Sequence, residues 1–199
     1  MEVVLIDSGG ANIGSVRYAL ERLGIDALLS ADAETITKAD RVILPGVGAA
    51  GAGMARLREL GLVDVVRSLR QPLLGICLGM QLLFESSEEN DSDCLGLLPG
   101  RVRKLTAGKG VRIPHMGWNA LRRRCDDYLL NNIADGAQAY FVHSYAVPVT
   151  DDTVAITTYG DEFAAVVRRG NCWGAQFHPE RSAAVGARLL ENFLADSLV

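Results

Sequence analysis

The sequence turns on one strand-to-helix junction, Gly75-Ile76-Cys77-Leu78-Gly79, which follows the apolar run Pro72–Ile76 and precedes the helical segment Leu78–Phe84. A G-x-C-x-G turn of this kind has the form of a nucleophile elbow, with cysteine where hydrolases often carry serine. The helix dipole and the free N–H groups at such a turn favour a thiolate, and the N–H of Leu78 is placed to receive an oxyanion. The alternative interpretation is a buried strand cysteine beside two packing glycines.

A second motif, Gln176-Phe177-His178-Pro179-Glu180, follows another apolar strand. Proline disfavours the helical conformation for the residue before it, so we expect His178 to be extended. Residues two apart in an extended segment point the same way, which predicts that His178 and Glu180 share one side. A carboxylate beside an imidazole can fix its tautomer, so the two motifs together predict a Cys77-His178-Glu180 triad. Both strands would end at the same carboxyl edge of a parallel sheet.

Strands and helices alternate along the first part of the chain, and strands dominate the second part. This order predicts a single α/β domain over residues 1–199, with a mixed, largely parallel sheet flanked by helices. The predicted strands are Val3–Ile6, Asp26–Leu29, Arg41–Leu44, Pro72–Ile76, Val102–Thr106, Gln138–Tyr145, Thr153–Tyr159, Phe163–Arg168 and Cys172–Phe177. The predicted helices are Asn12–Leu23, Ala52–Leu69 with a break at Gly61, Leu78–Phe84 and Ala183–Leu194, and Gly160-Asp161 predicts a hairpin.

The amino-acid composition of the chain argues against several classes of protein, among them nucleic-acid-binding, secreted and membrane-spanning proteins. With 49% hydrophobic and 22% charged residues the chain is globular, and its net charge of −4 gives no electrostatic footprint for nucleic acid. The acidic, short apolar start does not resemble a secretory signal, and no apolar run is long enough to span a bilayer. The four cysteines are scattered without CxxC spacing, so neither a disulfide framework nor a zinc site is expected. We therefore expect a cytoplasmic protein that does not act on membranes.

The other two histidines and Cys172 are competitors for catalytic roles. His115 and His143 lie in or beside strand-like apolar segments, where a hydrogen-bonded structural histidine is commoner, and neither has a carboxylate within three residues. We rank both below His178 as the base. Cys172 lies six residues before His178, on the same predicted strand, and we interpret it as a packed thiol.

At this point the chain resembles the class I (triad) glutamine amidotransferases. The resemblance rests on three blocks in order: Leu44–Gly48 (LPGVG), Gly75–Gln81 (GICLGMQ) and Gln176–Glu180 (QFHPE). Three further segments resemble the glutaminase subunits of imidazole glycerol phosphate synthases, which act in histidine biosynthesis: Asp7–Asn12 (DSGGAN), Pro114–Asn119 (PHMGWN) and Tyr140–Tyr145 (YFVHSY). The resemblance covers essentially the whole chain and implies the flavodoxin-like type of fold.

The resemblance assigns roles residue by residue. It makes Cys77 the nucleophile, His178 the base and acid, and Glu180 the orienter of a glutaminase that needs no metal or organic cofactor. The Val47-Gly48 peptide would add a second oxyanion N–H to that of Leu78. Substrate contacts are implied for Gln81, one helical turn after Cys77, for Glu89, and for Ser144 and Tyr145 through their backbone. Glu89 also fits a solvated loop, and that alternative stays open.

The resemblance also implies a partner, a (β/α)₈-barrel cyclase subunit that would receive ammonia from L-glutamine and form a heterodimer with this chain. Asn12, Trp118, Asn119 and Arg181 match positions near that interface, although a core position for Trp118 is equally compatible with the sequence. Three alternatives remain: a glutaminase subunit for anthranilate, GMP or pyridoxal phosphate synthase, a non-catalytic interaction subunit, and a stand-alone cysteine hydrolase acting on γ-glutamyl peptides.

Overall fold

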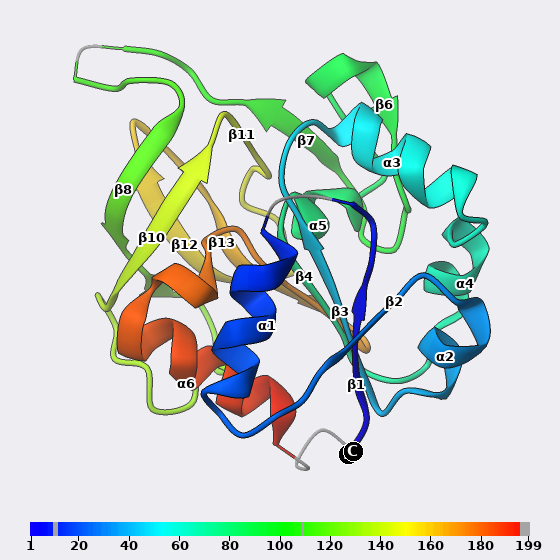
Figure 1. Cartoon of the computed structure of the whole chain (residues 1–199). Coiled ribbons are helices and arrows are strands. Elements are labelled where there is room, and N and C mark those ends of the chain that lie inside the picture. The colour runs from blue at the N-terminus through cyan, green and yellow to red at the C-terminus, as the bar shows by residue number, and fades with distance from the viewer. Residues whose placement is uncertain (10–11, 109, 196–199) are drawn as a thin grey trace.

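An eight-stranded sheet carries the elbow near its middle, in a computed structural model that describes residues 1–9, 12–108 and 110–195 (Figure 1). The strand pairs β2–β1, β1–β3, β3–β4 and β4–β14 are parallel, and the pairs β14–β13, β13–β12 and β12–β9 are antiparallel. The predicted mixed, largely parallel sheet is therefore confirmed. In spatial order the strands are β2 (Leu28–Ser30), β1 (Val3–Ile6), β3 (Arg41–Gly46), β4 (Leu73–Cys77), β14 (Cys172–Ala175), β13 (Asp161–Arg169), β12 (Thr153–Tyr159) and β9 (Arg122–Arg123).

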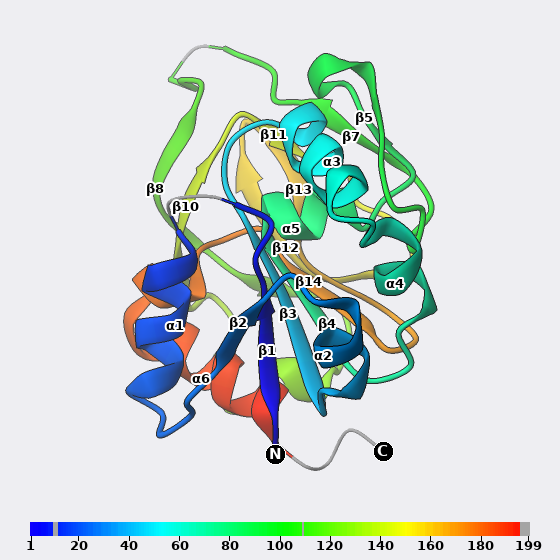
Figure 2. The ribbon, with the colours of Figure 1, turned by 45° about the vertical axis from the view of Figure 1, so that its right-hand side comes forward.

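Helices cover both faces of this sheet, as Figure 2 shows from the side. α1 (Ile13–Glu21) and α6 (Ala183–Leu194) lie on one face, and α2 (Ala33–Lys38), α3 (Ala50–Glu59), α4 (Val63–Ser68) and α5 (Leu78–Leu82) lie on the other. Helices are needed on both faces because the side chains of each strand alternate between the two faces, as those of β1 show. Val3 and Leu5 pack into the first core, whereas Val4 and Ile6 pack into the second. A strand buried on both sides is apolar throughout.

Most predicted helices begin and end within a few residues of the observed ones, but α2 was missed. α2 is six residues long, too short for a clear apolar period, and it begins where the Asp32 side chain accepts a 2.8 Å hydrogen bond from Thr35 N. The predicted break at Gly61 is confirmed. Gly61 has φ +67° and separates α3 from α4.

Two smaller sheets stand beside the main one. The first, called here the ribbon, pairs β8 (His115–Ala120) with β10 (Gln138–His143). The second joins β11 (Tyr145–Ala146), β7 (Arg101–Lys104), β5 (Ser86–Ser87) and β6 (Ser92–Asp93). The strand predicted over Gln138–Tyr145 is thus wrong as one element, because it divides between two sheets. β8 was not predicted as a strand, since glycine and polar residues interrupt its apolar pattern.

Short helical turns and one hairpin complete the connections. The 3₁₀ turns are η1 (Glu89–Asp91), η2 (Tyr128–Leu130) and η3 (Pro179–Arg181). The predicted hairpin joins β12 to β13 through Gly160, whose φ of +74° suits glycine. Of the helices described, none has the length and apolar character needed to cross a membrane.

Candidate active site

The elbow is built at the carboxyl end of β4, where Cys77 has φ 54° and ψ −110°, a strained conformation for a residue with a side chain. Sterics around it require glycine. A Cβ on Gly75 would lie 2.7 Å from the Gly79 backbone, and a Cβ on Gly79 would lie 1.8 Å from Leu44 O in the neighbouring strand. The glycines therefore allow α5 to start directly against β3, which holds Cys77 at the edge of the sheet.

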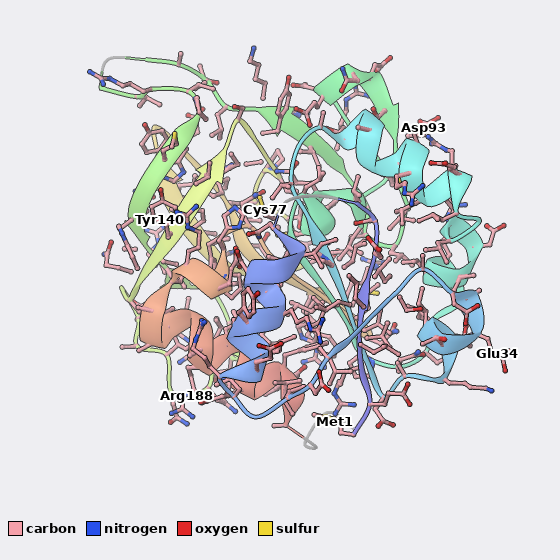
Figure 3. All side chains as sticks on the ribbon, in the orientation of Figure 1. Met1, Glu34, Cys77, Asp93, Tyr140 and Arg188 are labelled. Atoms are coloured by element: carbon pink, nitrogen blue, oxygen red, sulfur yellow. The ribbon has the colours of Figure 1, made fainter. Side chains whose placement is uncertain are left out.

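A pocket of about 600 Å³ opens over Cys77. In Figure 3, Cys77 is labelled near the centre of the molecule, and Tyr140, on the ribbon, is labelled to its left. The pocket lining brings together most of the site residues expected from the sequence: Asn12, Val47, Gly48, Cys77, Leu78, Gln81, Glu89, Ser144, Tyr145, His178 and Arg181. Pro114, Val142 and His143 line it as well. Trp118 and Asn119 lie outside the lining, on β8.

The imidazole of His178 faces the pocket from the end of β14, which runs parallel to β4 as expected. Its Nδ1 lies 2.8 Å from Glu180 Oε1, and both side chains are almost fully buried. The proximity agrees with the prediction but its reason differs, because Glu180 belongs to the 3₁₀ turn η3 rather than to an extended segment. Burial alone lowers the pKa of His178, but hydrogen bonds and charge from Cys77 and Glu180 outweigh it and raise that pKa to about 10. The imidazolium form is therefore favoured.

Asn12 contacts the side chains of Glu180 and His178, which the sequence did not reveal. Its Nδ2 donates to Glu180 Oε1 at 2.7 Å and lies 3.3 Å from His178 Nδ1. Glu180 Oε2 is buried without a partner in the part of the chain that the structure describes. The Asn12 amide is thus a principal hydrogen-bond donor to this carboxylate besides the imidazole. A separation of 168 residues between Asn12 and Glu180 left no local signal for the contact. Gly10 and Ala11, in the Asp7–Asn12 segment, fall outside the described residues.

Two buried glutamines connect Cys77 to the rest of the pocket. Gln176 Nε2 lies 3.8 Å from Cys77 Sγ, and its Oε1 accepts a 3.0 Å hydrogen bond from Gln81 Nε2. The same Gln81 Nε2 donates to Tyr145 O at 2.8 Å. Gln81 therefore stands on the face of α5 predicted for it, with its amide orientation fixed by two acceptors. Gln176 was quoted as part of a motif, and only the structure shows that its amide reaches the sulfur.

The loop residues predicted for oxyanion and substrate contacts surround the same space. Gly48 has φ +94°, a conformation that suits glycine, and it follows Val47 between β3 and α3. Glu89 is half-buried, and its Oε2 accepts a 2.7 Å hydrogen bond from Ala50 N at the start of α3. A carboxylate is stabilised at a helix N-terminus. Glu89 is therefore a fixed acceptor at the pocket wall rather than a freely solvated loop residue.

The remaining histidines lie in the ribbon as buried, hydrogen-bonded residues. His115 Nδ1 is 3.0 Å from His143 Nε2, and His115 stacks on Tyr159 with ring centroids 3.9 Å apart. Trp118 is 50% exposed, which excludes the core position left open by the sequence. Its ring packs edge-on against Tyr140, and the guanidinium of Arg181 lies 5.1 Å from the centre of the same Tyr140 ring.

The other cysteines differ from Cys77 in their surroundings. Burial raises the pKa of Cys94 and of Cys172 to about 11, whereas Cys125 is exposed and lies outside the pocket lining. Across residues 1–9, 12–108 and 110–195, no three His, Cys, Asp or Glu side chains gather closely enough to hold a metal ion. The arrangement at Cys77 suits nucleophilic attack on a carbonyl carbon, with an imidazolium available to protonate the leaving group.

Comparison with protein families gives a match over residues 4–197 to the model described as glutamine amidotransferase class-I. Among curated proteins, the chain is 63% identical over 193 residues to the imidazole glycerol phosphate synthase subunit HisH of Xanthomonas axonopodis pv. citri. That alignment covers 97% of this chain and 96% of the relative. The HisH subunit of Xylella fastidiosa strain Temecula1 is 60% identical with the same coverage.

Solved structures give the same fold at low sequence identity. A crystal structure of a glutamine amidotransferase superposes with a TM-score of 0.74 at 24% identity, covering 98% of this chain and 97% of that chain. The structure of PurLQS from Thermotoga maritima gives a TM-score of 0.76 at 21% identity, with 97% of each chain covered.

Proposed function

Because the chain belongs to the class-I glutamine amidotransferases, and within them to the HisH subunits of imidazole glycerol phosphate synthase, we propose that it hydrolyses L-glutamine at Cys77 and passes ammonia to a synthase partner. The observation that carries the proposal is the meeting of Cys77 and His178 in one pocket, with Glu180 and Asn12 bonded behind the imidazole. Residues from three separate segments, the end of β4, the turn after β14 and the start of α1, converge there on the chemistry that the family performs.

In the proposed reaction the Cys77 thiolate attacks the carboxamide carbon of glutamine. Backbone N–H groups of Leu78 and of the Val47-Gly48 segment would hold the oxyanion that forms. The His178 imidazolium gives its proton to the nitrogen, the carbon–nitrogen bond breaks, and ammonia leaves a glutamyl thioester on Cys77. Neutral His178 then takes a proton from water, whose oxygen attacks the thioester carbonyl carbon to release glutamate and the thiol.

The residues of the pocket wall around Cys77 and His178 would bind the glutamine substrate. Gln81 is fixed by Tyr145 O and Gln176, and Glu89 is fixed by Ala50 N, so both present oriented polar atoms before substrate arrives. Glutamine carries an ammonium and a carboxylate, and an oriented carboxylate such as that of Glu89 suits the ammonium. Ser144 and Tyr145 line the same wall, where their backbone could contact the substrate.

Labelling with a glutamine-analogue alkylator tests the catalytic assignment. We expect saturable labelling at Cys77 alone, lost in Cys77→Ala and unchanged in Cys172→Ala. Burial keeps Cys172 protonated at neutral pH, because its pKa is raised to about 11. Saturable labelling that persists in Cys77→Ala, or that maps to Cys172, contradicts the proposal.

The partner we propose is a (β/α)₈-barrel cyclase subunit, docked in the cytoplasm over the pocket mouth and the ribbon. The exposed surface there is apolar and aromatic: Met116 is 62% exposed and Trp118 50% exposed, and Tyr140 and Arg181 continue it to the pocket. Exposed aromatic anchors of this kind are typical interface hot spots. A barrel placed here would receive ammonia directly from Cys77.

Co-purification from the organism's own extract, followed by a titration with the purified barrel subunit, tests the partner. We expect Trp118→Ser to weaken binding by about 2 kcal/mol or more, which is roughly 30-fold in Kd. Tyr18→Ser is the matched control, because Tyr18 is 63% exposed on α1 outside the pocket lining. Equal affinities for wild type and Trp118→Ser would place the interface elsewhere.

A further inference from the structure

A continuous run of hydrogen bonds links the surface of β8 to the glutamine pocket. Asn119 Oδ1 lies 2.7 Å from His115 Nε2, His115 Nδ1 lies 3.0 Å from His143 Nε2, and His143 Nδ1 lies 2.8 Å from Tyr145 O. We call these four groups the histidine relay. Asn119 is half-buried, and both imidazoles are buried.

The relay is one proton short when both histidines are neutral. Three hydrogen bonds need three protons, and both ends of the relay, Asn119 Oδ1 and Tyr145 O, are acceptors. Two neutral imidazoles supply two N–H groups. One bond would then bring two lone pairs face to face in a buried site, which is unfavourable.

A third proton on the imidazoles does not suit their surroundings. Burial is the main cause that lowers the pKa of His143, to about 3, and the charges of His115 and His178 lower it further. Burial also lowers the pKa of His115. The rings of Phe141 and Tyr159 stack on His115, and the ring of Phe163 meets it edge-on. None of these rings offers a carboxylate to balance a charge. Both imidazoles are therefore neutral near pH 7.

Rotating the Asn119 amide by 180° completes the relay without any added charge. Nδ2 and Oδ1 then exchange places, and the amide donates to His115 Nε2. His115 donates from Nδ1 to His143 Nε2, and His143 donates from Nδ1 to Tyr145 O. The rotation gives up the contact of Asn119 Nδ2 with Thr158 O, which is long at 3.3 Å and exposed, and turns Oδ1 toward that carbonyl at a position where solvent can separate the two oxygens. A short buried hydrogen bond outweighs a long exposed one.

We propose that the Asn119 amide donates inward and thereby fixes His115 and His143 as Nδ1–H tautomers, as positioning residues for the glutamine site. The proton kept on His143 is donated to Tyr145 O, which holds Gln81 through a second hydrogen bond of 2.8 Å. Gln81 in turn bonds to Gln176. Side chains of the ribbon thus fix the position of Gln81 in the pocket wall. The kinetic part of this inference rests on the proposed glutaminase function.

Tautomers are read directly from two-bond ¹H–¹⁵N spectra of imidazole-labelled protein, and the chain has only three histidines. The His178→Gln spectrum assigns the third signal. We expect His115 and His143 to carry their protons on Nδ1 in the wild type at neutral pH. In Asn119→Asp, whose side chain accepts only, His115 must carry a proton on Nε2. Gln138→Glu is the matched control, since it introduces the same charge on β10 opposite Ala120, the residue after Asn119, on an exposed side chain outside the relay.

The effect on the pocket is measured with the diazoketone analogue of glutamine, whose labelling of Cys77 separates binding (KI) from the alkylation rate (kinact). His143→Leu removes the donor to Tyr145 O, and we expect KI to rise about fivefold to tenfold with kinact little changed. His143→Asn places an amide N–H close to the position of Nδ1 and restores most of the wild-type KI.

A proton on Nε2 of His115 in the wild type overturns the inference, as do equal KI values for His143→Leu and His143→Asn. Failure of the proposed function looks different. In that case the wild type shows no saturable labelling by the analogue, while the tautomers of His115 and His143 are still read from the spectra.

Discussion

The elbow and the ribbon face each other across one pocket, yet they are held in place by different forces. At the elbow, backbone atoms pack so closely that glycine is required, and a Cβ at Gly79 would lie 1.8 Å from Leu44 O. In the ribbon, side chains do the positioning, through the His115–His143 hydrogen bond and the stacking of His115 on Tyr159. Contacts of the first kind are all-or-none, whereas contacts of the second kind can be weakened in steps.

The largest effect is expected at the elbow. Gly79→Ala forces the Leu44 carbonyl away, so we expect the free energy of unfolding to fall by about 3 kcal/mol or more, or the protein not to fold. Gly14→Ala is the matched control, because Gly14 is exposed on α1 and no atom of residues 1–9, 12–108 and 110–195 lies within 4 Å of an added Cβ. At position 14, alanine should raise the free energy of unfolding by about 0.5–1 kcal/mol, because alanine favours the helical conformation more than glycine does. Urea unfolding followed by circular dichroism compares the two variants. Equal free energies of unfolding for Gly79→Ala and Gly14→Ala would contradict the steric explanation of Gly79.

The next effect concerns the contact that joins α1 to the site behind the elbow. Asn12→Leu removes the 2.7 Å hydrogen bond to Glu180, and hydrogen bonds to charged groups are worth about 1.5–3 kcal/mol. We expect kcat/KM for glutamine hydrolysis in the complex to fall roughly 10-fold to 100-fold. Tyr18→Phe on the same helix should change it little. If Asn12→Leu weakens only partner binding and not hydrolysis by the saturated complex, Asn12 serves the interface instead.

A third test contrasts the histidines of the two regions by pH. The pKa of His178 is raised to about 10, so its stabilisation is complete below pH 6.5 and is lost as the pH rises toward 10. The pKa of His143 is lowered to about 3, so its contribution is complete above pH 6.5 and is lost as the pH falls toward 3. Each group changes stability by at most about 1.4 kcal/mol per pH unit.

We therefore expect stability to peak near pH 6.5 and to fall on both sides, as measured by chemical unfolding from pH 4 to pH 9. His178→Gln should flatten the alkaline side, and His143→Gln the acidic side. If each variant flattened the opposite side, or neither side, the two histidines would not differ in the way described.

The smallest effect is expected at the edge shared by the pocket and the ribbon. Arg181 is exposed and its guanidinium lies over Tyr140, a contact worth about 0.5–1 kcal/mol at such a site. Arg181→Ala should weaken the affinity of the proposed barrel subunit by about 2-fold to 5-fold in a titration, and Arg181→Lys should recover most of the loss. A loss above 30-fold would instead indicate a buried ion pair with the partner. Arg188→Ala on α6 provides a charge-matched control.

Prediction from sequence worked well where neighbours along the chain carry the information. The β4–α5 junction, the break at Gly61 and the hairpin at Gly160 each depend on glycine geometry or on an apolar period within a few residues. It failed for α2, which is too short for a clear period and depends on the Asp32 cap, and for Gln138–Tyr145, which leaves one sheet and enters another.

The site divides in the same way. The residue types at Cys77, His178 and Glu180 were readable because each motif is local, and parallel strands bring both motifs to one edge. The sequence gives no distance for contacts such as Asn12 with Glu180 or Gln176 with Cys77, since amides occur throughout the chain and carry no pattern.

By itself, then, the sequence determined the sheet, the elbow and the pairing of a cysteine with a histidine, because backbone sterics and hydrophobic period act over short distances. Only the tertiary structure decided that Trp118 is exposed, that Glu89 caps α3, and that His115 and His143 lie ring to ring. Those outcomes depend on which side chains from distant segments share one buried space. There each donor must find an acceptor, and that condition is set by the whole fold.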